Sequence, residues 1–300
     1  RRDGVSQLTL AHITPTGTEE LAVLEVASAP PHVPDVADFR LLADGGSSVN
    51  HMPAICVIGS GGDIVLMPVD EEASAPAEVV GSVDQGILAA AWSPEEDVLV
   101  LITGGEKRLI VMTREFEVMS ETMLSTEAFG DDQPVNVGWG SKSTQFHGSE
   151  GKKAAMAAAN APEESDPRGP LVPEDDGLPR ISWRGDGAFF VTSSAEASHD
   201  TVHRILRTYT RTGTLSATSD RSVRGISHVL ACRPTGNLIA TTQRMGGPWA
   251  PGRHGRHDVV FFERNGLRHG EFSLREEHGS VPDVPGVSAE PLPPWSCEHQ

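Results

Sequence analysis

Short apolar runs separated by polar turns dominate the pattern of this chain. Runs of four to seven residues rich in Val, Ile, Leu, Phe and Thr alternate with turns rich in Gly, Pro, Asp and Asn, a pattern typical of β-strands. Clear examples are 64–67, 98–102, 109–112 and 259–262. No long stretch has the 3.6-residue period of an amphipathic helix, and the best helical candidate is the short Ala-rich segment 152–160. The pattern predicts an all-β fold.

One hairpin motif occurs three times in the chain. Each copy has an apolar strand, a tight polar turn and a second strand that is almost wholly apolar. The three copies span 90–100, 181–191 and 230–240. In this alignment Trp92, Trp183 and Cys232 all end the first strand, and a turn rich in Pro, Gly, Asp and Asn then reverses the chain.

Two further apolar runs follow each hairpin, so we expect sheets of four strands. The third runs are 109–112, 204–209 and 258–262, and the weaker fourth runs are 117–123, 215–219 and 268–274. A strand that is apolar on both faces must be covered on both faces. Sheets stacked face to face around an axis meet this requirement. This is the arrangement of a β-propeller, in which one blade recurs every ~40–45 residues.

Upstream of the first hairpin the same signals continue. The runs 39–42, 54–58, 63–67 and 78–83 form another set of four, and 8–13 and 21–26 are remnants of a blade before it. This count gives four to five blades, fewer than most closed rings need. The sequence therefore predicts a WD40-like β-propeller that is incomplete.

Two segments do not fit the strand pattern. Residues 148–177 are rich in Ala, Pro, Gly and acids, a composition that predicts a long flexible insertion. Residues 279–300 contain five prolines and no strand signal, so we expect a disordered tail. The predicted organisation is a partial propeller over 1–278, with the insertion 148–177, followed by the tail. Because the sequence does not begin with Met, we expect it to start part-way into a longer protein.

Charge and cysteine content restrict the function classes. The net charge is −18, yet residues 201–278 hold 12 Arg, no Lys and 6 acids. An acidic chain argues against wholesale nucleic-acid binding, and the Arg-rich part is either a solvated face or a local contact for a polyanion. Three cysteines without C-x-x-C spacing predict a reducing, intracellular compartment. No apolar stretch approaches the ~18–20 residues of a membrane span, and no export signal is evident.

No motif for catalysis, a cofactor or a metal ion stands out. The glycine-rich segments near 138–143 and 147–153 lack the spacing of phosphate-binding loops. His254 and His257 have no evident third ligand, and acid clusters such as 174–176 are typical of solvated turns. We therefore predict no catalytic residue, no cofactor and no metal site. Trp249, on a long loop, is a candidate anchor for a partner.

Several peptides resemble one family, the largest subunit of the Elongator complex, also called the IKAP family. The resembling segments are 112–117, 135–140, 144–151, 181–187, 234–243 and 258–270. The segment 144–151 is the most specific of them, because generic propeller architecture does not require it. The resemblance covers about residues 39–275, in matching order and spacing, and identifies the chain as part of the family's first N-terminal WD40-type propeller.

The resemblance implies a function that the residues alone do not. It implies a non-catalytic scaffold module of the Elongator complex, which supports modification of wobble uridines of tRNA, with catalysis in another subunit. The implied partners are other Elongator subunits, with homodimerisation through C-terminal regions that this chain lacks, in the cytoplasm and also the nucleus. One alternative is a generic WD40-type interaction propeller of another complex. The other is a surface that contacts tRNA directly, through Arg244, Trp249, Arg253, Arg256 and Arg268.

Overall fold

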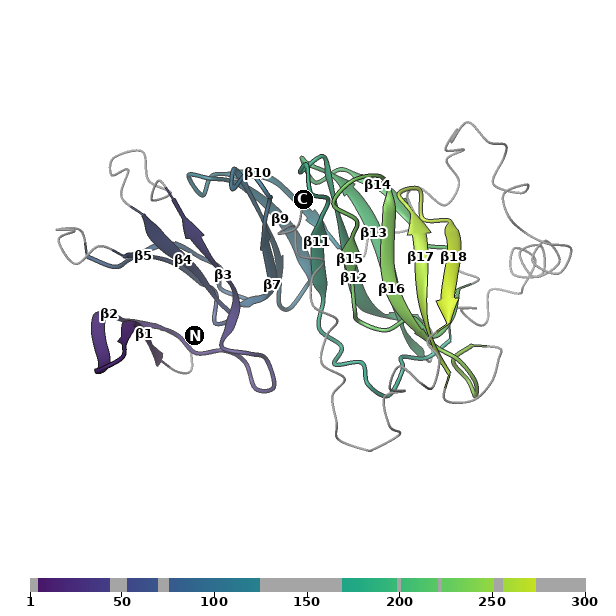
Figure 1. Cartoon of the computed structure of the whole chain (residues 1–300), viewed down its shortest axis with the longest axis horizontal. Helices are drawn as coiled ribbons and strands as arrows, with labels where there is room; N and C mark the ends of the chain where they lie inside the picture. The colour runs from purple at the N-terminus through teal and green to yellow at the C-terminus, as the bar shows by residue number, and fades with distance from the viewer. Residues whose placement is uncertain are drawn as a thin grey trace, which may run out of the picture. The chain divides into compact units, whose positions relative to one another are not determined.

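The computed structural model describes residues 5–43, 53–69, 76–124, 169–198, 201–220, 223–250 and 256–273. The chain divides into two compact units, Arg1–Leu124 and Ser125–Gln300. Every regular element within the described residues is a β-strand (Figure 1), as the sequence predicts. A search of the same residues finds no helix with the length and apolarity to cross a membrane. The predicted helix 152–160, the predicted insertion up to residue 168 and the predicted tail lie outside the described residues.

The described residues of unit 1 form ten strands in three antiparallel sheets. The sheets are the hairpin β1–β2, the sheet β3-β4-β5-β6 and the sheet β7-β8-β9-β10. Their bounds are β1 Val5–Thr14, β2 Gly17–Ala27, β3 Val36–Leu42, β4 Ala54–Gly59, β5 Asp63–Pro68, β6 Glu78–Ser82, β7 Ile87–Trp92, β8 Val98–Thr103, β9 Arg108–Thr113 and β10 Val118–Met123.

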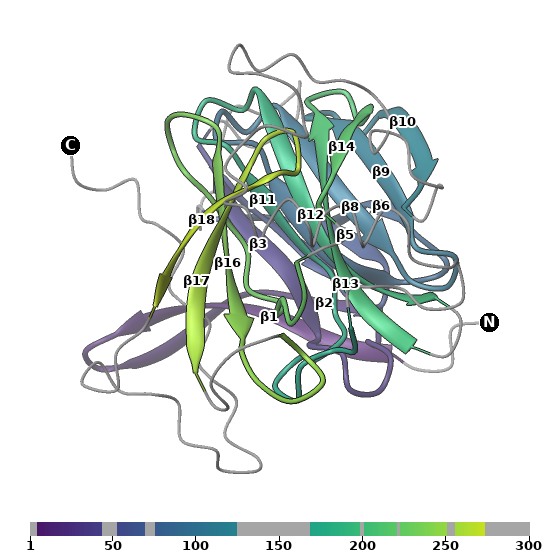
Figure 2. The ribbon, with the colours of Figure 1, turned by 90° about the vertical axis from the view of Figure 1, so that its right-hand side faces the viewer.

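In the part of unit 2 that the structure describes, eight strands form two sheets of four, β11-β12-β13-β14 and β15-β16-β17-β18. Figure 2 shows the long β12–β13 hairpin together with strands β16 to β18 of the other sheet. Their bounds are β11 Arg180–Trp183, β12 Phe189–Ser198, β13 Thr201–Thr210, β14 Leu215–Thr218, β15 Ala231–Cys232, β16 Leu238–Arg244, β17 His257–Glu263 and β18 Arg268–Ser273.

The three sequence repeats form the same hairpin in three sheets. Trp92 pairs with Leu99, Trp183 with Phe190 and Cys232 with Ile239. In each case the next residue donates its N–H across the turn, to the carbonyls of Val98, Phe189 and Leu238 at 2.8, 3.1 and 2.9 Å. Each turn also has one residue in the left-handed region, which is Glu96, Gly187 or Gly236. Glycine adopts this region freely, whereas Glu96 does so at a cost. The prediction of equivalent hairpins is confirmed.

Neighbouring sheets within each unit pack face to face. In unit 1 one cluster joins Leu42, Cys56 and Ile58 of the β3–β6 sheet to Trp92 and Leu99 of the β7–β10 sheet. In unit 2 another cluster joins β12 and β13 to β15, β16 and β17, with Phe189, Val191 and Leu206 against Cys232, Ile239, Val260 and Phe262. Burying each such side chain stabilises the fold by ~1.5–3 kcal/mol. Cys56 and Cys232 are core residues, as predicted, and burial raises the pKa of each thiol to about 12.

The β1–β2 hairpin takes the place of the two outer strands of a preceding blade. Its inner side chains, including Leu8 and Leu24, pack on Val57 and Val65 of the first four-stranded sheet. The residues after β2 meet the β4–β5 turn closely, since a Cβ atom at Gly61 would lie 1.9 Å from the Ala27 carbonyl oxygen. The residues after β6 meet the β8–β9 turn in the same way, since a Cβ atom at Gly104 would lie 2.2 Å from the Gln85 carbonyl oxygen. β2 is therefore equivalent to β6, the fourth strand of a blade.

Asp63 connects this hairpin to the sheet. Its side chain is 2% exposed, and its Oδ2 accepts a hydrogen bond from the Ala27 N–H at 2.6 Å. We predict that Asp63→Ala lowers the free energy of unfolding by about 1–3 kcal/mol, because it leaves that buried N–H without an acceptor. Asp63→Asn keeps an oxygen acceptor and is expected to cost less. Urea unfolding of both variants tests this, and an Asp63→Ala variant as stable as the wild type would contradict it.

Asp38, on β3, makes the stability of the protein depend on pH. Burial raises the pKa of its carboxyl group from 3.8 to about 6, against the opposing effects of the Phe39 N–H and the Arg40 charge. The folded state therefore binds this proton more tightly than the unfolded state, and stability is lost as the pH rises from about 4 to about 6.

Asp38→Asn stays neutral across this range, so we predict that it gains stability relative to the wild type as the pH rises. Thermal unfolding at pH values below 4 and above 6 measures the difference. Asp84→Asn, at an exposed position, is the matched control for the loss of one carboxylate. A difference between Asp38→Asn and wild type that stays constant with pH would refute the prediction.

Candidate functional site

Three consecutive acids bind three arginines that come from three different strands. The acids are Glu174, Asp175 and Asp176, here called the acidic clip, in the loop before β11. Their partners are Arg244 of β16, Arg204 of β13 and Arg180 of β11. A turn shapes the loop, with the Asp175 N–H donating to the Val172 carbonyl at 3.0 Å. The Leu171 N–H also donates to the Val202 carbonyl at 2.9 Å, which fixes the loop beside β13.

The central pair, Asp175 and Arg204, is fully buried. Both side chains are 0% exposed. Arg204 Nε donates to Asp175 Oδ2 at 2.6 Å, and its Nη2 donates to Oδ1. Nη1 donates to the carbonyls of Leu178 and Ser193 at 3.1 and 3.3 Å. All three guanidinium nitrogens therefore have acceptors, as a buried charge requires.

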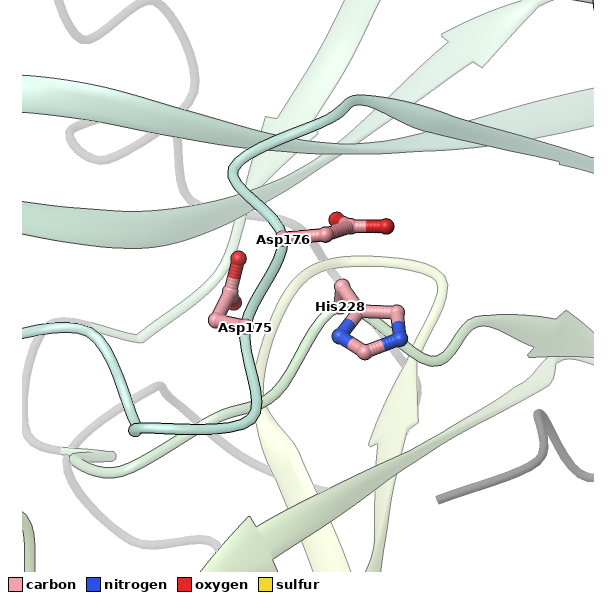
Figure 3. Close-up of side chains that lie close together, drawn as sticks. All are labelled: Asp175, Asp176 and His228. Carbon is pink, nitrogen blue, oxygen red and sulfur yellow. The ribbon is translucent and has the colours of Figure 1, made fainter. Parts of the chain in front are cut away.

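His228 faces the two aspartates from the loop before β15 (Figure 3). The ligand atoms of Asp175, Asp176 and His228 lie within 4.8 Å of one another. Burial raises the pKa of the Asp176 carboxyl group, but Arg180 and the Leu178 N–H outweigh it and hold that pKa below its usual range. Burial also lowers the pKa of His228, with Asp176 opposing and Arg180 adding to the effect, so the imidazole favours its neutral form.

This group of three side chains does not fit a metal site. Arg204 occupies both oxygens of Asp175, and Arg180 and the Leu178 N–H occupy the two oxygens of Asp176. A cation here would have to displace two guanidinium groups, whose charges repel it. The neutral His228 alone is not a sufficient ligand set. Each carboxylate oxygen of these two aspartates accepts at least one hydrogen bond from the protein, and the arrangement positions the loop.

Glu174 extends the clip toward the second sheet of unit 2. Its Oε2 accepts from Arg244 Nη1 at 3.1 Å, and its Oε1 lies 3.8 Å from His257 Nδ1. The Arg244 guanidinium lies 4.7 Å from the centre of the Trp249 ring, a cation–π contact. Trp249 Nε1 in turn donates to the Leu171 carbonyl at 3.2 Å. Glu174, Arg244 and Trp249 therefore form one intramolecular network.

The structure places the predicted contact residues as follows. Arg244 and Trp249 lie together in that network. Arg256 donates to both oxygens of Asp258 at 2.7 Å and to Ser273. Arg268 is exposed and pairs with Glu271. Arg253 lies outside the described residues, and contact of this set with tRNA or a partner stays a prediction.

The acidic clip also bears on the predicted insertion. The last nine residues of that insertion, 169–177, are described and have the contacts given above, and the flexible insertion over 148–177 stays a prediction. We expected the acids 174–176 to be solvated, and Asp175 is instead buried. A signal was present in the sequence, because three acids between Pro173 and Gly177 precede an Arg-rich region. That signal does not say which arginines pair.

We predict that Asp175→Asn lowers the free energy of unfolding by about 3–5 kcal/mol, because it leaves Arg204 buried without a counter-charge. Replacing both residues by apolar side chains of similar volume is expected to cost much less than the single change. A double-mutant cycle followed by urea unfolding measures this, with the exposed Asp186→Asn as control. A single variant within about 0.5 kcal/mol of the wild type would refute the role assigned to the pair.

Comparisons with known proteins agree on one family. Elongator complex protein 1 of Mus musculus is 40% identical over 221 residues, which is 74% of this chain and 15% of that protein. The Schizosaccharomyces pombe protein of the same name is 38% identical over 224 residues, 74% of this chain and 17% of that protein. The chain therefore spans less than a fifth of the length of these curated relatives.

Solved structures give weaker likenesses. Sqt1 of Chaetomium thermophilum, bound to the N-terminus of ribosomal protein L10, has a TM-score of 0.48 and 15% identity, over 93% of this chain and 58% of that one. The C-terminal WD40 domain of Sif2 has a TM-score of 0.46 and 14% identity, over 90% of this chain and 55% of that one. At these scores neither likeness bears on function.

The family assignment rests on the sequence match. The family described as "ELP1 first N-terminal beta-propeller" matches residues 7–284, which include all the four-stranded sheets described above. The resemblance and the WD40-like propeller fold predicted from the sequence are thereby confirmed. This chain belongs to the Elongator complex protein 1 family, in the part that forms its first N-terminal β-propeller.

Proposed function

We propose that the chain is a non-catalytic scaffold module of the Elongator complex, which supports modification of wobble uridines of tRNA. The observation that carries the proposal is the family match over residues 7–284. A propeller presents the turns and edges of several sheets to partners at once, and this use requires no reactive side chain.

The chemistry of the polar cluster in unit 2 supports a scaffold role. The carboxylates of Asp175 and Asp176 are held by Arg204 and Arg180, and the thiols of Cys56 and Cys232 are buried with a raised pKa. General acid–base catalysis needs a group whose proton can move at working pH in reach of a substrate. Carboxylates that are held in ion pairs with arginines fix the position of the chain instead. We accordingly assign catalysis to a partner subunit.

The remaining expectations form part of the same proposal. The partners are other Elongator subunits, and homodimerisation uses parts of the full-length protein beyond this chain. The location is the cytoplasm, and the nucleus as well. The alternative of an interaction propeller in another complex predicts a different set of partners and no effect on tRNA modification.

Direct tRNA contact through the predicted arginines is a second hypothesis, and the geometry does not favour it. Arg244, Arg256 and Arg268 each have an acidic partner. Binding a phosphate through them requires that partner to be displaced, which reduces the gain in free energy. The scaffold proposal is independent of this contact.

The test uses the full-length protein that contains this sequence, tagged in its own cells. Asp175→Ala is introduced to destabilise the propeller, with Arg224→Gln at an exposed loop position as the matched control. We expect the wild type and the control to co-purify with the other Elongator subunits, whereas the Asp175→Ala protein loses them. Wobble-uridine modification, measured by mass spectrometry of tRNA nucleosides, is expected to fall with the captured subunits.

Three outcomes would count against the proposal. Capture of a stable complex without Elongator subunits would favour the generic interaction propeller. Unchanged capture and unchanged tRNA modification in an Asp175→Ala protein shown to be unfolded in this region would refute the scaffold role. Modification activity in the purified chain alone would refute the assignment of catalysis to a partner.

A further inference from the structure

Four arginines gather where the turns of the two sheets of unit 2 end. They are Arg184 in the β11–β12 turn, Arg211 in the β13–β14 turn, Arg233 in the β15–β16 turn and Arg264 in the β17–β18 turn. In an antiparallel sheet of four strands, the first and third turns lie at the same end. The two ends are adjacent, because the Cys232 N–H donates to Ser182 Oγ at 2.9 Å across the sheets. We call this surface the basic turn face.

Phe189 holds two of these guanidinium groups. Arg184 lies 5.6 Å and Arg264 lies 4.9 Å from the centre of the Phe189 ring. Arg211 Nη1 donates to the Gly187 carbonyl at 3.1 Å, which brings it to the same turn as Arg184. Cation–π stacking fixes a guanidinium plane while its N–H edges remain able to donate.

The acids near this face neutralise it only in part. Arg184 lies 3.3 Å from Asp186, and Glu263 is paired with His269. The backbone of Asp220 meets the β17–β18 turn at Gly266. Among the residues that the structure describes, no ion pair joins an acid to Arg233 or Arg264. Arg233 is exposed and Arg264 is half-buried, and because neither is paired with an acid of the described residues, both can pair with a ligand.

The fold itself does not require arginine at these turns. The equivalent β7–β8 turn carries Glu95, Glu96 and Asp97, and it closes with the same hydrogen bond as the other two hairpins. The β9–β10 turn carries Glu115 and Glu117 beside Arg114. The same turn geometry is thus built with acids in one sheet and with arginines in two others. The positive charge of the basic turn face needs a reason other than folding.

We propose that the basic turn face binds the phosphodiester backbone of a nucleic acid strand, with Arg233 and Arg264 as the main contacts. Arginine donates two parallel N–H groups to a phosphate, and backbone contacts need no base-specific groups. An acidic protein partner fits less well, because protein interfaces rest on apolar or aromatic anchors. The exposed large apolar residues of the described part of unit 2 are Val202 and Phe272, both at the opposite end of their strands.

This surface differs from the contact set expected from the sequence, and the inference does not rest on the scaffold role. The overall charge of −18 lowers the affinity for a nucleic acid, because distant acids repel the strand, whereas the local contacts between arginine and phosphate are strongest at low salt. At physiological ionic strength the Debye length of about 8 Å screens those acids, but it screens the contacts as well. Binding is therefore expected to be steeply salt-dependent.

The experiment measures the fluorescence anisotropy of a labelled oligouridylate with the whole 300-residue chain, between about 50 and 200 mM salt. We expect the double variant Arg233→Glu/Arg264→Glu to bind at least about tenfold more weakly at low salt. The slope of log affinity against log salt is expected to shrink by about 1.4, or 0.7 for each lost phosphate contact. If the double variant unfolds, the same measurement is made with Arg233→Glu alone, because that side chain is exposed.

Arg224→Glu is the matched control for Arg233→Glu, since both side chains are exposed in loops of unit 2 and Arg224 lies at the other end of the sheets. It is expected to leave affinity nearly unchanged. An oligodeoxynucleotide is expected to bind like the RNA, because the contacts are to phosphate. No binding at low salt, equal loss with Arg224→Glu, or tighter binding of poly-glutamate would each overturn the proposal. None of these outcomes would alter the capture of Elongator subunits by the full-length protein.

Discussion

The need to cover both faces of each apolar sheet governs the structure. All six residues of β8 are buried, so the sheet that contains β8 needs a neighbour on each side. The first four-stranded sheet shows the same need at its other face, where the β1–β2 hairpin covers Val57, Val65 and Met67. Two strands cannot cover a sheet of four, and Phe39 and Leu41 on β3 remain 69% and 56% exposed. The hairpin therefore covers only part of the apolar face that a whole blade would cover.

Much of this fold follows from local sequence signals. The hairpins at Trp92, Trp183 and Cys232 were predictable because their turn chemistry and apolar strands are short-range features. The left-handed conformation of Glu96 was not evident by itself, since glutamate does not favour it. It becomes evident only through the alignment with Gly187 and Gly236. A repeat thus carries information that a single turn does not.

The acidic clip could not be derived in the same way. Asp175 and Arg204 are 29 positions apart and Glu174 and Arg244 are 70 apart, and nothing in the composition selects these pairs from the other arginines. Composition also favoured a solvated loop, because acids next to prolines are usually exposed. The contact of Asp175 with Arg204 in the folded chain buries this acid instead. Since the desolvation of a buried pair offsets most of its attraction, the contribution of the clip is to fix where the loop lies rather than to add much stability.

The arginines of unit 2 show why a count of charges says little about function. The arginines of this unit follow one another closely in the sequence from Arg180 onward, yet the fold divides them between two ends of the same sheets. At one end Arg180, Arg204 and Arg244 are neutralised by the clip, and their role is internal. At the other end Arg184 and Arg264 share the Phe189 ring, and Arg264 has no ion pair with an acid of the described residues, so its N–H groups have more to gain from a ligand than from the protein. The identity of the partner group, and not the residue type, separates a structural arginine from one that can recognise an anion.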